Sequence, residues 1–527
     1  MKRYWFYFVC PLLLLASCGK DAVPATGRDS DGAVSHDMIQ LGEKLKDPYT
    51  VENMRTALTK VYPTKAGRVD ISATDLYVRF LPPDEESLRR LQERGVYLMD
   101  HPMDYRIVKE GDYYQDPEVG PDAITWQYAL VPRDFDFPDG IKWELLDECY
   151  LSENDPSTRS MPDIDWAEVE REAFRISGNA DMLGPDEPTR ASAKATPHGR
   201  ITIVDPGANG GKAFGVAGVK VVANCFVKIA TCYTDRDGYY SMKTEFSSKP
   251  RYRLVFENST GFSIGLNLIV IAGSVSTMGT GPQEGLDLEV TSSSDRRLFT
   301  RCVVNNAAYD YYSRCVPNDL DIASPPSDIR LWIFQELKAS SAVMLHHGAF
   351  IDRDLFQKYL GDYSRIIKLF LPDITLGVKE KEDYSLIWSV TTHELAHGSH
   401  YSRVGNNYWT PYVDFILSSY LEGGTFSYGT DGAEDSGYCA VGESWAYFMQ
   451  SSLWQDRYGG DMPLFGAEFW FHPQIFIELY SRGMSRGDLF RALKKDVTSM
   501  DDLKDTLLSL YPDQESTISL VFARYGC

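Results

Sequence analysis

The chain has 527 residues, of which 43% are hydrophobic and 24% are charged. This composition is typical of a globular protein and excludes a disordered or fibrous chain, and the length leaves room for about two to four domains. The 75 acidic residues exceed the 53 basic residues and give a formal net charge of -22. Because a surface of this sign repels phosphate backbones, we expect no nucleic-acid partner.

The N-terminus has the pattern of a secretory signal. Two basic residues precede an apolar run over residues 4–16, which is too short to span a bilayer but has the length of a signal-peptide core. The sequence Leu-Ala-Ser-Cys-Gly at 15–19 resembles the cleavage site of a bacterial lipoprotein signal. The resemblance implies removal of residues 1–17, a lipid anchor on Cys18, and an outer-membrane lipoprotein facing the periplasm or the cell surface. The alternative is an ordinary secretory signal that contains a cysteine.

A flexible tether, an α+β domain and a linker are expected next. Residues 18–40 are rich in Gly, Asp, Ser and Ala and are predicted to form the tether. Residues 41–150 are predicted to form a small N-terminal α+β domain. Its elements are a helix over 84–94 and strands over 76–81, 96–99, 125–131 and 142–146. Residues 151–198 are expected to be a linker, apart from one acidic helix over 166–175.

Residues 199–292 change to the period of β-strands. Polar and apolar residues alternate over 219–223 and 252–256, and the sequence Asp-Arg-Asp-Gly at 235–238 predicts a turn. Several short strands with such turns indicate a β-sandwich. The residues Gly-Arg-Ile at 199–201, together with this turn, resemble the carboxypeptidase regulatory-like domain. That resemblance implies a transthyretin-like β-sandwich that acts as a spacer or docking module and has no peptidase activity of its own.

The C-terminal part, residues 293–527, is predicted to be mainly helical and carries a metal-binding pattern. His393, Glu394 and His397 form an HExxH motif within a helix expected over residues 384–403. Residues at i and i+4 lie on one helix face, so the two imidazoles can bind one Zn²⁺ ion while Glu394 acts as general base toward a bound water. The alternatives are a helix whose histidines only pack, and a degenerate peptidase.

The third zinc ligand is predicted to be Glu443. A metzincin would have a histidine where this chain has Arg403, so that class is excluded. His400 shares the helix face but lies too far along the axis to join the same ion easily. Glu443 is expected at the opening of an apolar helix, where a buried carboxylate needs a cation. The sequence Val-Gly-Glu-Ser-Trp-Ala at 441–446, together with HExxH, resembles gluzincin metallopeptidases of the fungalysin and thermolysin type. The alternative is a solvated glutamate near a helix N-terminus.

The resemblance implies a C-terminal zincin-like catalytic domain, with one departure. Gluzincins carry an aspartate four residues after the ligand glutamate that orients a zinc histidine, and this chain has Tyr447. Strands expected over 366–370 and 374–376 correspond to the sheet edge along which gluzincins hold extended peptides. Three residues are candidates for stabilising the oxyanion, by position only: His472, Tyr438 and Tyr428.

The sequence therefore predicts a zinc-dependent metallopeptidase, with an endopeptidase favoured, that acts on protein or peptide substrates and is anchored to the membrane by its N-terminal lipid. The alternative is a catalytically inactive cell-surface binding lipoprotein with a peptidase-like domain. A third possibility is that residues 41–150 are an inhibitory prosegment. The adjacent pair His346 and His347 is interpreted as structural. Cys225 with Cys232, and Cys302 with Cys315, are the closest candidate disulfide pairs in sequence.

Overall fold

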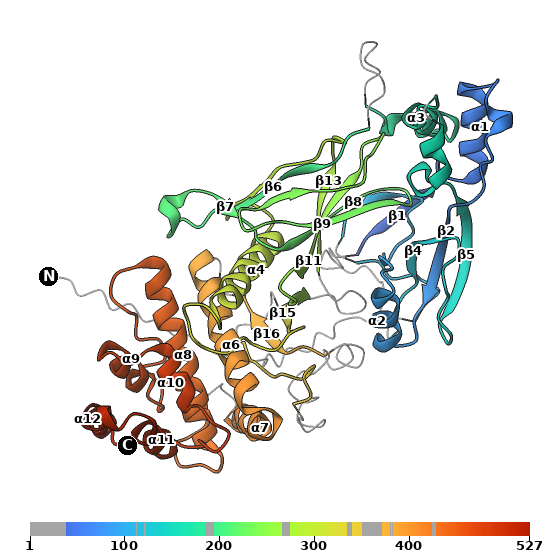
Figure 1. Ribbon diagram of the computed structural model, residues 1–527. Helices are drawn as coiled ribbons and strands as arrows, with labels where there is room; N and C mark the ends of the chain where they lie inside the picture. The colour runs from blue at the N-terminus through green and yellow to red at the C-terminus, as the bar shows by residue number, and fades with distance from the viewer. Residues whose placement is uncertain are drawn as a thin grey trace, which may run out of the picture.

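The chain folds into an N-terminal β-rich region and a C-terminal mainly helical region (Figure 1). The computed structural model describes residues 38–527 except 112, 121–122, 162, 185–193, 266–273, 335–339, 350–370, 380, 382 and 424–427. Residues 1–17, Cys18 and nearly all of the expected tether lie outside the described residues. No helix within the described ranges has the length and apolar character that a membrane span requires.

The first part of the chain forms two small antiparallel sheets with helices beside them. In the larger sheet, β2 pairs with both β4 and β5, and in the smaller sheet β1 pairs with β3. The elements are β1 (Gln40–Lys44), α1 (Val51–Val61), β2 (Asp75–Leu81), α2 (Glu85–Glu93), β3 (Tyr105–Lys109), β4 (Gln127–Pro132) and β5 (Lys142–Cys149). The Asp84 side chain caps α2 by accepting from the Ser87 N–H. The strand expected over 96–99 is wrong, because Met99 makes only an isolated bridge to Tyr128.

The segment expected to be a linker contains a helix that is packed into the protein. Helix α3 (Trp166–Ile176) agrees with the predicted acidic helix, and its Phe174 ring packs against Phe226 of the following region at 6.0 Å. The buried Glu170 carboxylate forms ion pairs with Lys194 and Lys228. Residues 151–184 are therefore packed against the rest of the protein and are not a free linker.

A seven-stranded sheet occupies the middle of the molecule in the order β16-β15-β12-β11-β8-β9, with β13 paired to β11. A second sheet joins β6 to β10, β14 and β7. The strands are β6 (His198–Ile203), β7 (Phe214–Gly215), β8 (Val219–Cys225), β9 (Lys228–Tyr233), β10 (Tyr239–Ser241), β11 (Arg251–Asn258), β12 (Ser263–Gly265), β13 (Val275–Thr280), β14 (Leu288–Val290), β15 (Arg330–Phe334) and β16 (Ile374–Gly377). Strand β12 pairs in parallel with β15, so the sheet continues across the domain boundary expected at residues 292 and 293.

The alternation predicted for β11 is present. Tyr252, Leu254 and Phe256 are fully buried on one face of the strand. The predicted turn before β10 also forms, because the Asp235 carboxylate accepts from the backbone N–H of Asp237 and of Tyr239 at 2.9 Å. Gly238 closes this turn with a φ of 82°, and a Cβ at this position would overlap the carbonyl oxygen of Ile201.

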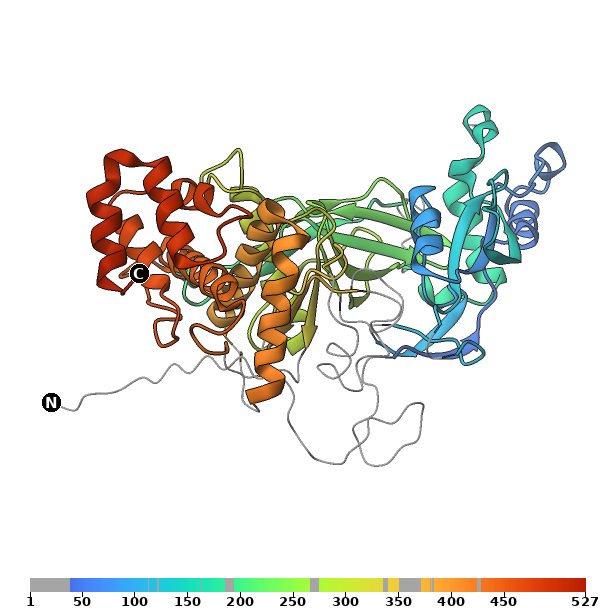
Figure 2. The same ribbon diagram turned by 90° about the horizontal axis from the view of Figure 1, so that it is seen from below.

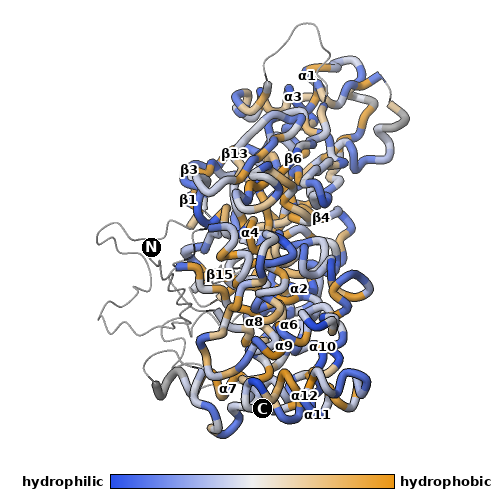
Figure 3. The backbone as a smooth tube through the Cα atoms, turned by 90° about the vertical axis from the view of Figure 1, so that its left-hand side faces the viewer, coloured by the Kyte–Doolittle hydropathy of each residue, from blue (hydrophilic) through white to orange (hydrophobic). Residues whose placement is uncertain are grey.

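The C-terminal region is a group of helices stacked against the β16 end of the sheet (Figure 2). They are α4 (Arg296–Arg314), α6 (Tyr384–Val404), α7 (Asn406–Gly423), α8 (Ser436–Tyr458), α9 (Pro473–Ser481), α10 (Arg486–Ala492), α11 (Met500–Leu510) and α12 (Glu515–Arg524). Figure 3 shows hydrophobic stretches running through the middle of the molecule from the strands into these helices. The Arg457 guanidinium of α8 reaches the Asp205 carboxylate after β6 at 2.7 Å and joins the helices to the second sheet.

The seven cysteines in the described part of the chain are all free thiols. The candidate pairs are therefore wrong. Cys302 and Cys315 lie 13 residues apart along α4 and at its C-cap, which separates them by about 20 Å at 1.5 Å per residue. Cys225 and Cys232 lie at different levels of the β8–β9 hairpin, where Cys225 is opposite Lys228 and Cys232 is opposite Val221.

Candidate metal centre

Helix α6 carries the HExxH motif and agrees with the helix expected over residues 384–403. It follows Asp383 as N-cap and ends at Gly405, whose φ of 74° stops the helix. The spacing of four residues places His393 and His397 on one face, with ring centroids 4.9 Å apart. Both side chains are buried, with exposed fractions of 4% and 2%. The two imidazoles are therefore preorganised side by side away from bulk water.

Helix α8 supplies the carboxylate that faces them. The expectation that Glu443 opens this helix is wrong, because α8 begins at Ser436 and Glu443 lies two turns inside it. Its side chain is only 4% exposed, so the alternative of a solvated glutamate is also wrong. The indole N–H of Trp445 donates to the carbonyl of Ala396 at 3.2 Å and holds α8 against α6. The packing of α8 on α6 thus brings Glu443 close to His397, which lies 46 positions earlier in the sequence.

Within the described residues, His393, His397 and Glu443 form a group whose ligand atoms all lie within 4.8 Å of one another. The two Nε2 atoms are 3.2 Å apart. Glu443 Oε2 lies 3.4 Å from His393 Nε2, and Glu443 Oε1 lies 3.6 Å from His397 Nε2. Two donors bound tetrahedrally to one ion at about 2.1 Å are separated by about 3.4 Å. The spacing of the two imidazole nitrogens is close to this value, and each faces one oxygen of Glu443, so the three side chains could hold a single metal ion.

The charges of this group agree with a cation site. Burial alone would raise the pKa of Glu443, but the neighbouring His397 and His393 hold it well below its usual range. Burial lowers the pKa of His397. For His393, burial acts in the same direction and is the largest single cause, but the hydrogen bonds with Glu443 and Gln450 and the negative charges of Glu443 and Glu394 together outweigh it and raise the pKa. Glu443 thus stays ionised although it is buried, which is the state that a metal ligand needs.

Gln450 orients His393. Its side-chain oxygen lies 3.1 Å from His393 Nδ1, and its amide nitrogen donates to the Ser389 hydroxyl at 2.6 Å. The Nε2 atom of His393 is thereby directed into the site. Tyr447 does not make this bond; its ring packs edge-on against the His393 ring at 4.4 Å. The sequence reasoning missed Gln450, although its position seven residues after Glu443 places it two turns further along the same face of α8.

Tyr412 is a second residue that the sequence reasoning missed. It comes from α7, and its hydroxyl donates to Glu443 Oε1 at 2.6 Å. The same hydroxyl lies 3.5 Å from His397 Nε2. The phenol is buried next to the His393, His397 and Glu443 group, and it is a polar contact that α7 makes with this group. No motif spacing identifies this tyrosine, because its approach depends on how α7 turns back after Gly405.

Glu394 lies beside the group without belonging to it. Burial, followed by the negative charge of Glu443, raises the pKa of Glu394 to about 8, and the backbone N–H of Ala342 forms a hydrogen bond that acts in the opposite direction. Its Oε2 atom is buried without a hydrogen-bond partner. A divalent cation nearby would favour the ionised form. The structure therefore places a carboxyl group with a free acceptor atom next to the three candidate metal ligands.

Several sequence candidates lie outside the metal group. His400 packs between Tyr408 and Trp409, and burial lowers its pKa to about 3, so it is a neutral core residue. The Tyr438 ring packs on Tyr408 at 4.8 Å. The His472 ring packs on a tyrosine of the C-terminal segment, at the start of α9.

Tyr428 is connected to the group only indirectly. Its hydroxyl forms a hydrogen bond of 2.9 Å with the hydroxyl of Tyr447, which in turn packs on His393. Among the three candidate oxyanion residues, Tyr428 is thus the one that the described contacts connect to the site. Tyr412 lies nearer to the group than any of them.

The neighbouring sheet edge contains one of the two strands expected there. Strand β16 confirms the strand predicted over 374–376, while residues 366–370 lie outside the described ranges. The pair His346 and His347 agrees with a structural interpretation, because His347 lies 3.0 Å from the buried Asp373 carboxylate and 2.9 Å from the carbonyl of Ser327. No known protein family, curated protein or solved structure matches this chain.

Proposed function

We propose that this chain is a zinc metallopeptidase of the gluzincin type, most similar to the fungalysin and thermolysin group, and that it favours endopeptidase cleavage. The observation that carries the proposal is the His393, His397 and Glu443 group, in which one ligand atom from each residue lies within 4.8 Å of the others and the two Nε2 atoms are 3.2 Å apart. Two imidazoles and one carboxylate are a ligand set typical of catalytic zinc, which leaves a fourth position for water or substrate.

Bound Zn²⁺ would supply Lewis acidity toward the scissile carbonyl and lower the pKa of water. Glu394 is the general base in this proposal, because its buried Oε2 has no other partner and can accept the proton of an attacking water. Gln450 keeps the proton of His393 on Nδ1, and Tyr412 orients the Glu443 carboxylate. To stabilise the oxyanion in place of the three earlier candidates, the single O–H of Tyr412 would turn from Glu443 to the substrate.

We extend the proposal to the architecture. Residues 293–527 form the zincin-like catalytic domain, and residues 199–292 form a transthyretin-like β-sandwich whose sheet is continued by β15 and β16. The described contacts of the metal group come from α6, α7 and α8 and not from residues 41–150, which gives the prosegment interpretation no support. The proposed location is the outer membrane, with a lipid on Cys18 as the anchor and proteins or peptides as substrates.

The test is zinc content and peptide cleavage measured on the same purified samples. We expect about one zinc per chain in the wild type and loss of zinc in His393→Ala and Glu443→Ala. Glu394→Gln should keep its zinc and lose cleavage by at least about a hundredfold, since it removes only the base. His472→Gln, whose native ring packs on Tyr525 and not on the three ligand residues, is the matched control and should behave as wild type.

Two outcomes would separate the alternatives. Zinc retained by Glu443→Ala would refute the ligand assignment. Full zinc occupancy without cleavage of casein or fluorogenic peptides would favour the inactive surface-binding lipoprotein instead. Cleavage that survives in Glu394→Gln would refute the role of the base.

A further inference from the structure

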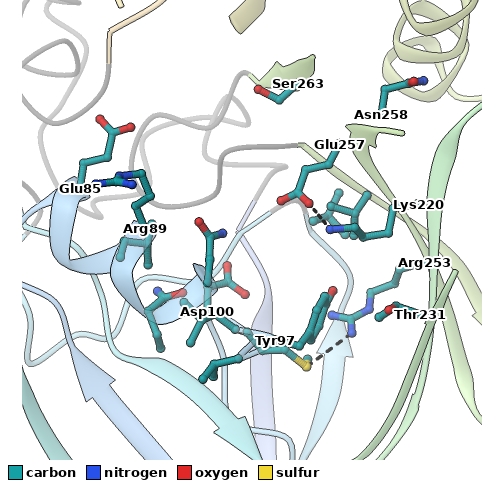
Figure 4. A pocket seen from close by; sticks show the side chains of 18 of the residues that line it. Glu85, Arg89, Tyr97, Asp100, Lys220, Thr231, Arg253, Glu257, Asn258 and Ser263 are labelled. Atoms are coloured by element: carbon teal, nitrogen blue, oxygen red, sulfur yellow. Dashed lines mark hydrogen bonds and ion pairs between the residues drawn. The ribbon is translucent and has the colours of Figure 1, made fainter. Parts of the chain in front are cut away.

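A large cavity lies between the N-terminal region and the central sheet. Its volume is about 980 Å³. One wall is formed by α2 and the segment that follows it, and the other by β8, β9, β11 and β12 (Figure 4). His393, His397 and Glu443 do not line it. The cavity is therefore a separate feature, created where the N-terminal region covers the outer face of the sheet.

Arg253 of β11 is buried at this cavity without an acidic partner. Its side chain is 4% exposed. The guanidinium donates to the neutral side-chain oxygen of Asn224 at 3.1 Å and approaches the Met99 sulfur at 3.5 Å. Its Nε atom has no hydrogen-bond partner. Figure 4 shows the guanidinium directed from β11 toward Tyr97 across the cavity floor. Burying a guanidinium without a counter-ion costs free energy, so buried guanidinium groups are normally paired with an anion.

The other cations around the cavity are already matched with carboxylates. Lys220 pairs with Glu257, Arg330 with Glu85, Arg251 with Glu110, and Arg89 with Glu86. Asp100 lies 2.8 Å from His101, which burial keeps neutral by lowering its pKa. Among the arginine and lysine side chains that line the described walls, Arg253 is thus the one without a carboxylate in direct contact.

Other hydrogen-bond donors without partners lie around the same cavity. Besides Arg253 Nε, the Nε atom of Arg251 and one terminal nitrogen of Arg330 are buried without partners. Burial lowers the pKa of Arg251 to about 10, and the positive charge of Arg253 adds to this shift. Guanidinium groups bind carboxylates and phosphates through paired hydrogen bonds. The site therefore offers both the charge and the donors that an oxyanion requires.

Apolar side chains complete the lining. Leu88, Val96 and Tyr97 come from the N-terminal side, and Phe262 and Val275 come from the sheet side. A volume of this size is far larger than a bare ion needs and lies in the range of about 300–1,000 Å³ that holds small organic ligands. We propose that the cavity is a binding site for an organic anion, a carboxylate or phosphate on an apolar body, with Arg253 as its counter-ion.

The experiment is calorimetric titration of the purified full-length protein with benzoate and with phenyl phosphate at fixed ionic strength. Benzamide is the neutral probe of the same shape as benzoate. We expect saturable binding of at least one anion, at least about tenfold tighter than benzamide, because one charged contact in a buried site is worth that much. The anion that binds more tightly identifies the head group.

Three variants locate the binding. Arg253→Met replaces the apolar stem of the side chain but removes the guanidinium and should weaken binding by about tenfold or more, while Arg253→Lys should retain part of it. Arg89→Met, at the rim and already paired with Glu86, should stay within about twofold of wild type. Circular dichroism checks folding. If Arg253→Met does not fold, the wild-type preference for anion over benzamide, together with an anion-dependent rise in Tm, decides the question.

The proposal is overturned if neither anion binds the wild type below about 10 mM, or if benzamide binds as tightly as the tighter of the two anions. It is also overturned if folded Arg253→Met binds the anions as tightly as wild type. None of these results depends on zinc or on peptide cleavage, so this proposal can fail while the proposed activity stands.

Discussion

Replacing Gln450 by methionine tests how the buried ligands are held. The side chain keeps its length but loses both hydrogen bonds, the one with His393 Nδ1 at 3.1 Å and the one to the Ser389 hydroxyl at 2.6 Å. A metal ion bound at Nε2 requires the proton of His393 on Nδ1, and in Gln450→Met that buried N–H has no acceptor. The substitution therefore destabilises the metal-bound state.

The size of the effect follows from this unpaired donor. A buried polar group without a partner costs about 1–3 kcal/mol, and each 1.4 kcal/mol corresponds to about a tenfold change in affinity. We expect Gln450→Met to weaken Zn²⁺ binding by about ten- to a hundredfold. Gln450→Glu keeps an acceptor for His393 and can accept from Ser389, so we expect its affinity to equal or exceed that of the wild type.

Competition with a chromophoric zinc chelator measures the two affinities. Gln455→Met is the matched control, because Gln455 lies on the same helix and donates to the carbonyl of Gly460 at 3.1 Å, away from the metal group. Its zinc affinity should stay within about twofold of wild type. If Gln450→Met binds zinc as tightly as this control, the orienting role of Gln450 is wrong.

Three further predictions concern other buried contacts. Tyr412→Phe removes the 2.6 Å hydrogen bond to Glu443 and should weaken zinc binding by about tenfold in the same competition assay; unchanged affinity would contradict the role of Tyr412. Lys228→Met leaves the buried Glu170 carboxylate of α3 with Lys194 as its remaining cation and should lower the free energy of unfolding in urea by about 2 kcal/mol, and a loss below about 1 kcal/mol would count against it. Asp205→Asn deprives the mostly buried Arg457 of its carboxylate and should cost about 2–3 kcal/mol in the same titration, with an undiminished midpoint as the refuting result.

Local patterns predicted the parts of the site that lie on one helix. The i and i+4 spacing of His393 and His397 determines that their rings share a face wherever that helix is placed, and α6 has this geometry. Glu443 was also found from the sequence, because an apolar run around a lone carboxylate indicates a buried charge. Its position within the helix was misjudged, since the start of α8 at Ser436 carries no capping side chain to mark it.

The supporting residues could not be found in this way. Gln450 and Tyr412 are polar residues in apolar helices, and each becomes functional only through contact with a different helix. The pairing of β12 with β15 was equally hidden, because parallel neighbours far apart in the sequence share no local signal. The sequence showed Tyr447 where the gluzincins that it resembles have an aspartate, but it did not show that Gln450 contacts His393.

Strand β11 shows what the sequence alone determines and what only the tertiary structure determines. Alternation by itself determined that Tyr252, Leu254 and Phe256 share a buried face, because successive side chains in a strand point to opposite sides. The same alternation assigns Arg253 to the opposite face, which for charged residues normally means solvent. Only the tertiary structure buries it, because the N-terminal region lies over that face and removes the water that would otherwise solvate the guanidinium.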